Sequence, residues 1–469
     1  MKNILNLPFF YLLFLSGFLN SALNAQTAPQ IIADSLQSIL DNAQHNGFTH
    51  PGVIMKISVP GQWTWSGASG FAISGQSAGQ PQTSANSTMK FRTGSITKNM
   101  VAVCILKLQE DGLLNINDPI ANYLRPTLVN DTILSSDTVT IRQLLNHTSG
   151  IANSADNTSC QLNVLSNPLG SHTLEEAVYC GTSQGELFPP GTAWSYSNTN
   201  YSLLAMIIES LSGMSYAAFL NQEIIQALNL QNTEIPASSQ ISGAHMGCYW
   251  FLGANPWTDL TLIHPSTYTG WADLVSTTED LITYYTALRN GQILNSTELS
   301  LMYSIDAASF DYGMGIDFYQ VYGSSYVGHY GEVGNSSGLF YADINSTLAP
   351  NGYYIAYNFN TQGSAMRNLI DKPVMNLLKY FTISENEIVK NTTFSMSPNP
   401  ASNAVQFCFT AGDFDTIRIF DLLGRSVECK QIESYSTNLS LNLSALPRGT
   451  YFVSMSGENS YQRQTLILK

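Results

Sequence analysis

Apolar and polar positions alternate along the chain with periods that change from region to region. Residues 31–44 carry apolar side chains at helical spacing, and residues 52–73 alternate like two strands joined by a Pro-Gly turn. A mostly helical middle follows from about residue 95, strand patterns return over 312–359, and residues 368–381 suit a closing helix. This order predicts an α/β (α+β) domain in which both ends complete one antiparallel sheet, with a helical subdomain packed beside it.

The pattern changes again near residue 384. Residues 383–403 are polar and include two prolines, as in a linker, which we place at 384–396. Residues 397–469 form short alternating runs with turn residues between them. These runs predict a small all-β sandwich. We expect a main domain over 26–383 and find no internal repeats.

The first 25 residues have the features of a secretory signal peptide. Met1-Lys2 supplies one positive charge, an apolar run follows, and Ala25 is a small residue suited to cleavage before Gln26. An uncleaved membrane anchor is the alternative, although the run is shorter than the roughly 20 residues that a span needs. We therefore predict that the mature protein is exported through the periplasm, secreted or held at the cell surface, without stable membrane insertion.

Composition narrows the choice of partners. The 469 residues include 19 basic and 33 acidic side chains, a net charge of -14, which argues against nucleic acid as a partner. Six cysteines suit an oxidising compartment. Cys160 and Cys180 bracket a loop-like segment and Cys408 and Cys429 share the C-terminal region, so two local bridges fit the spacing, while Cys104 fits a buried free thiol. Since no metal-ligand spacing occurs, we expect no metal and no cofactor.

A serine and a lysine stand one helical turn apart where a helix is expected to begin. Ser95 and Lys98 follow a glycine and open an apolar helix, so both side chains share one face. A buried lysine loses its proton more readily and can then act as a base toward the serine. A second S-x-x-K, Ser87 to Lys90, has no such helix behind it, and we expect Lys90 to be solvated. A helix cap with a surface lysine is the alternative reading of the first copy.

Two further patterns bear on the same chemistry. Tyr196-Ser197-Asn198 is the only Y-x-N in the chain and precedes a long apolar helix. A phenol beside a cationic lysine can have a lowered pKa and relay a proton, and an asparagine amide can orient the lysine and hold a substrate carbonyl. A buried tyrosine at a helix start is the alternative.

The third pattern is H-x-G, at His329-Tyr330-Gly331. It leads into an apolar strand, where a glycine would let substrate lie against the strand edge and a backbone N–H face an oxyanion. Three other histidines also begin an H-x-G: His45, His50 and His245. Of these, His245 is the main competitor.

Taken in the order S-x-x-K, Y-x-N, H-x-G, residues 30–382 resemble the serine β-lactamase and D-alanyl-D-alanine carboxypeptidase superfamily, in its class C-like, carboxypeptidase and esterase branch. The resemblance implies a β-lactamase/transpeptidase-like fold and an acyl-serine mechanism. It implies that Ser95 is the nucleophile and that Lys98 and Tyr196 exchange its proton. Asn198 would position substrate and His329 would tune Tyr196 electrostatically or hold its hydrogen bonds. The backbone N–H groups of Ser95 and of Glu332, which follows Gly331, would form the oxyanion hole.

Departures from the family pattern bear on the substrate. His329 stands where efficient β-lactamases have a lysine, which favours ester or D-amino-acid amide hydrolysis and leaves room for weak β-lactamase activity. Glu332 would repel a substrate carboxylate if its side chain points into the cleft, and a solvent-facing glutamate is the alternative. Neutral esters or amine-bearing peptides would then be preferred. Trp271 stands where many relatives have a small residue, and it either narrows the pocket or fills core.

The C-terminal region resembles the sorting domain of Bacteroidetes type IX secretion cargo, over roughly the last eighty residues. That resemblance implies the type IX secretion machinery as a partner, and an ordinary β-sandwich accessory module is the alternative. The sequence thus predicts an exported serine hydrolase for a small-molecule or peptide substrate. Two other functions remain open: an inactive penicillin- or peptide-binding protein on the same scaffold, and an adhesin acting through the tail.

Overall fold

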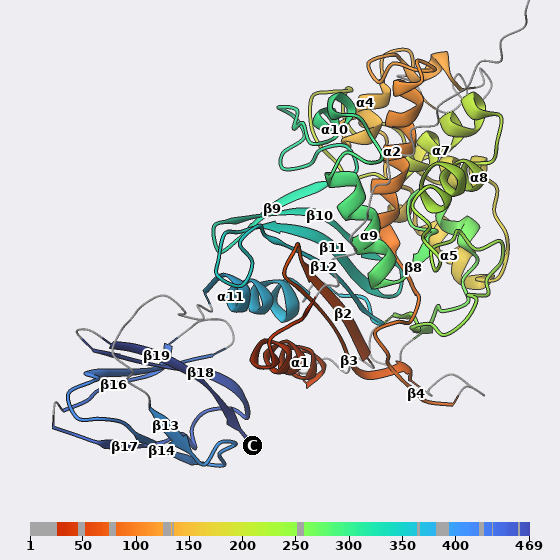
Figure 1. Ribbon diagram of the computed structural model, residues 1–469. Coiled ribbons are helices and arrows are strands. Elements are labelled where there is room, and N and C mark those ends of the chain that lie inside the picture. Colours follow the sequence, from red (N-terminus) through yellow and green to blue (C-terminus); the bar gives the residue numbers. More distant parts are fainter. Residues whose placement is uncertain are drawn as a thin grey trace, which may run out of the picture.

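The computed structural model describes most of the chain (Figure 1). The described residues are 26–45, 52–74, 81–124, 133, 136–250, 258–363, 366–380, 394–421, 426–433, 435–457 and 460–469. The predicted signal peptide and most of the predicted linker lie outside these ranges. The domain boundaries therefore remain predictions.

The main domain is built on one twisted sheet. Its strands lie in the order β1-β3-β2-β12-β11-β10-β9, with the short β4 pairing with β3. All their pairings are antiparallel except the two-residue contact of β1 with β3, as the sequence predicted for the sheet as a whole. The strands span Gln26–Thr27 (β1), Gly52–Val59 (β2), Trp63–Ile73 (β3), Thr83–Ser84 (β4), Asp317–Val321 (β9), Ser324–Glu332 (β10), Ser336–Asp343 (β11) and Tyr353–Phe359 (β12).

Alternation along the strands gives the sheet two buried faces. In β2, Val53, Met55 and Ile57 belong to one apolar cluster and Ile54 to another. Helices α1 (Gln30–His45) and α11 (Lys372–Tyr380) cover the first face, and α9 (Thr278–Arg289) covers the second (Figure 1). The N-terminal strands and the C-terminal strands of the domain are thereby held in one sheet, as predicted.

The helical subdomain lies beside the sheet around α2 (Thr97–Glu110), which is buried along most of its length (Figure 1). Capping boxes at Thr140 and Thr173 begin two of the short helices, and Gly213, at φ 68°, ends α7. Around α2 are α4 (Ile141–Leu145), α5 (Thr158–Ser166), α6 (Leu174–Thr182), α7 (Asn198–Ser212), α8 (Tyr216–Leu220) and α10 (Ser296–Met302).

A small pair of strands ties the start of α2 to a distant segment. β5 (Phe91–Arg92) pairs with β8 (Val275–Ser276), and the backbone N–H of Thr93 donates to the carbonyl of Leu274. Residues 271–274 are thereby held against the turn that leads into α2. A further two-stranded pair joins β6 (Tyr249–Trp250) to β7 (Thr258–Asp259).

The C-terminal region is all-β, as the sequence predicted. Three strands, β13 (Ser395–Ser397), β14 (Ala404–Cys408) and β17 (Asn438–Asn442), form one sheet. Four strands, β16 (Ser426–Gln431), β15 (Thr416–Phe420), β18 (Gly449–Gly457) and β19 (Ser460–Leu468), form the other. Most of their apolar side chains form one separate cluster, whereas Phe452 of β18 belongs to the cluster on the first face of the main sheet.

The cysteine predictions have mixed outcomes. Cys160 and Cys180 form a disulfide and Cys104 is a buried free thiol, as expected. The bracketed segment is not a loop, because Asn157 and Thr173 cap two short helices, α5 and α6, within it. The predicted Cys408–Cys429 bridge is wrong, since both thiols are free and exposed on strands that belong to different sheets, β14 and β16.

Within the described residues, no single helix is long and apolar enough to cross a membrane, and one pair of helices bent by 80° passes that test jointly by length and composition.

Candidate active site

Ser95 lies in a one-turn helix, η1 (Gly94–Ile96), at the start of α2. Gly94 has φ 58°, and a Cβ there would lie 2.5 Å from the backbone nitrogen of Glu332. On the other side of this contact, a Cβ on Gly331 would lie 1.9 Å from the carbonyl oxygen of Thr93. The two glycines therefore allow the serine turn to pack directly against the end of β10.

The end of β10 is open on the side away from β11. β10 pairs with β11 as far as Glu332, whereas its pairing with β9 ends at Gly328 opposite Asp317. Among the described strands, none covers residues 329–332 on that second side. This edge, with its glycine, borders the cleft as the H-x-G pattern predicted.

Lys98 is fully buried behind Ser95. Its Nζ lies 3.0 Å from Oγ of Ser95 and donates to the carbonyl of Trp271 at 3.1 Å. Burial holds the pKa of this lysine well below its usual value, and the nearby carboxyl of Asp273 works in the opposite direction. The lowered pKa favours the neutral amine, the form whose lone pair can accept the serine proton.

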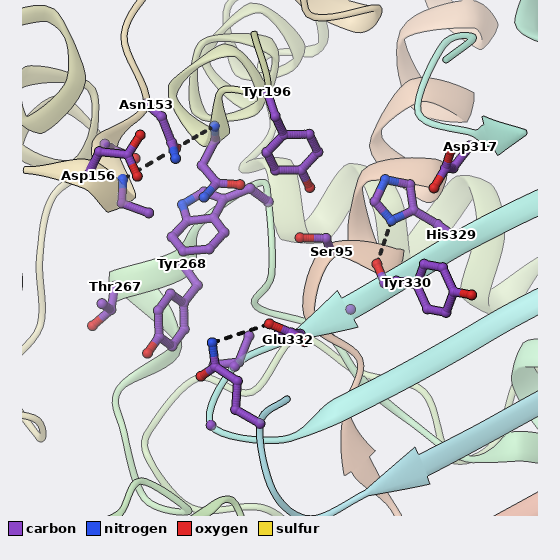
Figure 2. Close-up of a pocket in the computed structure, with 18 of the residues that line it drawn as sticks. Ser95, Asn153, Asp156, Tyr196, Thr267, Tyr268, Asp317, His329, Tyr330 and Glu332 are labelled. Atoms are coloured by element: carbon purple, nitrogen blue, oxygen red, sulfur yellow. Dashed lines mark hydrogen bonds between the residues drawn. The ribbon is translucent and has the colours of Figure 1, made fainter. Parts of the chain in front are cut away.

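Tyr196 faces the same serine. Figure 2 shows its hydroxyl directed toward that of Ser95, and the ring centroid lies 4.9 Å from Nζ of Lys98. Burial raises the pKa of the phenol, while a hydrogen bond with Ser95 lowers it. The expectation of a lowered phenol pKa is thus wrong here, because burial disfavours the charged phenolate.

Asn198 is the first residue of α7 and lines the cleft. Its backbone N–H donates to Oδ1 of Asn153 at 3.0 Å, whereas its own Oδ1 is buried without a hydrogen-bond partner. The amide therefore does not orient Lys98 as the sequence argument expected. Its acceptor oxygen is therefore an unsatisfied polar atom in a residue of the cleft wall.

A histidine that the sequence argument did not single out supports this turn. His147 is buried at φ 63°, and its Nδ1 accepts from the backbone N–H of Ser197 at 3.2 Å. Its ring lies 4.3 Å from that of Tyr196. His147 therefore fixes the Tyr196-Ser197-Asn198 turn from behind, and its place in an N-H-T-S-G run was the only sequence signal.

His329 is buried on β10, and both ring nitrogens are occupied. Nδ1–H donates to the carbonyl of Tyr330, and Nε2 accepts from the hydroxyl of Tyr312 at 2.8 Å. Burial, reinforced by nearby Lys98, lowers the pKa of His329 to about 3. The ring is neutral, and its centroid is 6.4 Å from that of Tyr196. The sequence argument expected His329 to act on Tyr196 through its charge or through hydrogen bonds. Instead, the neutral ring of His329 is hydrogen-bonded to Tyr312, a residue that the sequence argument did not identify.

Glu332 faces the cleft, which resolves the alternative left open by the sequence. Its side chain accepts from Nε2 of Gln362 at 3.2 Å, and burial raises its pKa (Figure 2). Trp271 also lines the cleft, with its ring 5.3 Å from Nζ of Lys98, so it narrows the pocket.

The competing motifs lie elsewhere. Lys90 of the second S-x-x-K pairs with Glu234 at 2.9 Å, so it is not simply solvated as expected. His245 is half-buried, does not line the cleft, and bonds the carbonyl of Gly243. The side chains of His45 and His50 are outside the described part of the structure.

The cleft has a volume of about 1180 Å³. Its walls carry aromatic and apolar side chains, and the Cys160–Cys180 bridge lies in one wall. The size is that of a site for a drug-sized molecule or a short peptide. Among the described residues, no group of three or more histidine, cysteine or acidic side chains could hold a metal ion.

The Beta-lactamase family model matches residues 40–379. The chain belongs to the β-lactamase family. A second model, the secretion system C-terminal sorting domain, matches residues 395–469. The C-terminal region is therefore a type IX sorting domain, which marks the protein for secretion or display at the cell surface.

Solved structures of this fold include amidohydrolases. A D-stereospecific amidohydrolase from Streptomyces sp. is 27% identical with a TM-score of 0.64, covering 74% of this chain and 98% of that one. D-amino acid amidase from Ochrobactrum anthropi SV3 is 24% identical with a TM-score of 0.60, covering 70% and 91%, and shares the fold.

Sequence relatives include penicillin-binding protein homologues. The putative penicillin-binding protein PbpX of Bacillus subtilis is 26% identical over 298 residues, 62% of this chain and 68% of the relative. Protein flp of Staphylococcus aureus is 28% identical over 204 residues, and the match spans only 38% of its length. The β-lactamase-type fold with these relatives is consistent with serine hydrolase activity.

Proposed function

We propose that the protein is an exported serine hydrolase that forms an acyl-Ser95 intermediate with ester or D-amino-acid amide substrates, in the manner of carboxypeptidases and esterases, with weak β-lactamase activity at most. The observation that carries the proposal is the buried Nζ of Lys98, whose pKa is lowered by burial and which lies 3.0 Å from Oγ of Ser95 at the open edge of β10. The names of the amidohydrolase neighbours support the substrate class.

The reaction begins with transfer of the Ser95 proton to Lys98 as Oγ adds to the substrate carbonyl. The backbone N–H groups of Ser95 and Glu332 hold the oxyanion, and loss of one such donor typically costs about 10²–10³ in rate. The C–N or C–O bond then breaks, and the proton passes from Lys98 through Tyr196 to the leaving group.

The second half-reaction returns Ser95 to its starting state. Water attacks the acyl-Ser95 ester while Tyr196 and Lys98 take its proton, and that proton returns to Oγ as the acid leaves. Asn198 positions the acyl group through its amide, whereas Tyr312 and His329 hold the strand end in place rather than exchange protons.

The test compares Ser95→Ala with Ser87→Ala, the serine of the second S-x-x-K, as a matched control. The mature protein is given p-nitrophenyl acetate, D-phenylalanine amide and a fluorescent penicillin. We expect hydrolysis and covalent labelling to be lost by at least 10³-fold in Ser95→Ala and kept in Ser87→Ala, about the size of effect seen when a nucleophile is removed. Equal behaviour of wild type and Ser95→Ala would reject the hydrolase and leave a binding protein on this scaffold.

A further inference from the structure

The charges around the cleft are of one sign. Four carboxylates line it: Asp156, Asp311, Asp317 and Glu332. Among the described lining residues, none is a lysine or an arginine. Lys98 is buried behind Ser95 and is not among the residues that line the cleft. A cleft lined by one sign of charge concentrates ligands of the opposite sign, here cations.

Three of these carboxylates can be placed relative to the reacting serine. Figure 2 shows Asp156 and Asp317 on opposite sides of Ser95, with Glu332 near the strand end below it. Asp156 ends the one-turn helix η3 (Ser154–Asp156) and is exposed, while Glu332 is partly buried and bonded to Gln362. A substrate acylating Ser95 therefore binds in a cleft that has carboxylates in its walls on both sides of the serine.

A second, independent feature of the cleft is a buried acceptor oxygen without a hydrogen-bond partner. Asn198 is 5% exposed and lines the cleft, yet its Oδ1 has no hydrogen-bond partner. A buried acceptor left without a partner is costly, so a bound molecule that donates an N–H there is stabilised. Like the four carboxylates, this oxygen can only accept.

The remaining walls suit an apolar or aromatic side chain. Trp194, Tyr268, Trp271 and Phe310 present rings to the cleft, and Val164 and Leu165 of α5 add aliphatic surface. Aromatic faces also stabilise a nearby ammonium group. Charge and shape therefore favour one ligand chemistry: a protonated amine attached to a bulky apolar residue.

We propose that the cleft selects substrates carrying a free, protonated amine and an aromatic side chain, and discriminates against the same compounds with the amine acylated or replaced by a carboxylate. This inference rests on the proposed function, since it names the substrate class for that reaction. It assigns Asp156 and Glu332 as specificity-determining side chains through their charge.

The test uses three anilides that differ only in charge: D-phenylalanine p-nitroanilide, its N-acetyl form and its N-succinyl form, at a pH where the free amine is protonated. We expect kcat/KM to fall in that order. The fall from the cationic to the neutral substrate should be about tenfold, because the cationic amine gains one or two charge interactions inside a partly shielded cleft. Raising the ionic strength from about 0.05 M to about 0.5 M should bring the cationic-to-neutral ratio of kcat/KM closer to one.

Substitutions of the cleft carboxylates test which side chains produce the preference for a cationic substrate. Asp156→Asn and Glu332→Gln, each nearly isosteric, should reduce the cationic-to-neutral ratio of kcat/KM several-fold. Asp111→Asn, which removes an exposed charge outside the cleft, should leave the ratio unchanged. Using the ratio cancels any effect that a variant has on both substrates alike.

A binding measurement separates the two proposals. In Ser95→Ala, calorimetry should give a several-fold lower Kd for D-phenylalanine amide than for its N-acetyl form. Turnover of all three anilides with a ratio near one, or a ratio that neither cleft variant changes, would overturn charge selection and leave the hydrolase intact. Absence of turnover together with selective binding would reject the hydrolase and retain charge selection.

Discussion

Lys98 and Asp273 form the buried electrostatic pair on which the proposed chemistry depends. The aromatic rings of Tyr196, Tyr201 and Trp271 surround Nζ of the lysine at 4.9–5.5 Å. Asp273 is also buried and accepts from the backbone N–H of Gly270 at 3.2 Å; burial raises its pKa to about 7. Its negative charge favours the lysine's ammonium form, so it limits how far the lysine's pKa falls.

Replacing that carboxyl should move the pH profile in a defined direction. In Asp273→Asn the ammonium form loses its neighbouring charge, so the pKa of Lys98 falls further and the base stays neutral to lower pH. We expect the acidic limb of kcat/KM for p-nitrophenyl acetate to shift to lower pH. The pH dependence of kcat/KM, measured on wild type and on the variant, tests this shift of the acidic limb. An unmoved limb would show that Asp273 does not act on the lysine.

The same variant should change stability with a pH dependence of known sign. A carboxyl whose pKa is raised on folding destabilises the native state as pH rises from its unfolded value through about 7. Asp273→Asn should therefore melt several degrees higher than wild type near pH 8, with the gain shrinking toward pH 4. Thermal unfolding of both proteins at pH 8 and at pH 4 measures the difference in melting temperature. A difference that is the same at both pH values would come from altered packing and would contradict the electrostatic explanation.

Sequence reasoning located the residues whose spacing is local. Ser95 and Lys98 meet because three positions on a helix make one turn, and Tyr196 and Asn198 share one turn. Tyr312 escaped notice because it reaches His329 only through the approach of β9 to β10. No sequence spacing predicts that contact. The neutral state of His329 results from its burial, which the H-x-G motif does not indicate.

At the scale of elements, α5 is the part of the cleft wall with the weakest anchoring. None of its nine residues is buried, yet Cys160, Val164 and Leu165 line the cleft. The Cys160–Cys180 disulfide and a 2.8 Å bond from Nδ2 of Asn157 to the carbonyl of Cys180 tie this helix to α6. The covalent bridge therefore replaces the apolar face that normally holds a helix in place.

Removing the bridge should affect binding of large substrates more than chemistry. In the double variant Cys160→Ser, Cys180→Ser we expect KM for D-phenylalanine p-nitroanilide to rise several-fold, because α5 no longer holds its side of the cleft. We expect kcat/KM for the small p-nitrophenyl acetate to change less than about twofold, and the 20-residue separation gives an upper bound of about 3 kcal/mol on the lost stabilisation. Equal losses for both substrates would show that α5 supports the catalytic residues.

The periodicity of apolar positions predicted the long elements better than α5 and α6. Helix α1 and the β2–β3 pair follow directly from alternating or helical patterns with a buried face. Helices α5 and α6 begin at capping residues within a segment of weak periodicity, which the sequence argument treated as loop-like. The exposed thiols of Cys408 and Cys429 likewise depend on which sheet each strand joins, which local pattern does not determine.

At the scale of the whole molecule, the sorting domain lies against helix α1, on the side of the sheet opposite the helical subdomain. Figure 1 shows it beside α1 and α11. Phe452 of β18 packs into the apolar cluster beneath these helices, and the hydroxyls of Ser38 and Thr450 contact each other. None of its described residues lines the cleft. The export signal and the candidate active site are thus on separate surfaces of one chain.

This separation predicts that removing the tail leaves the chemistry intact. A protein ending at Tyr380 should keep kcat/KM for p-nitrophenyl acetate within about twofold, while its melting temperature falls by a few degrees because the Phe452 contact is lost. Phe452→Ala in the full chain isolates that contact and should lower the melting temperature without changing the rate. A tenfold change in rate on truncation would mean that the tail acts on the cleft. Retained activity would mean that the domain before the linker is a complete enzyme by itself, since it contains every residue assigned to acylation and charge selection.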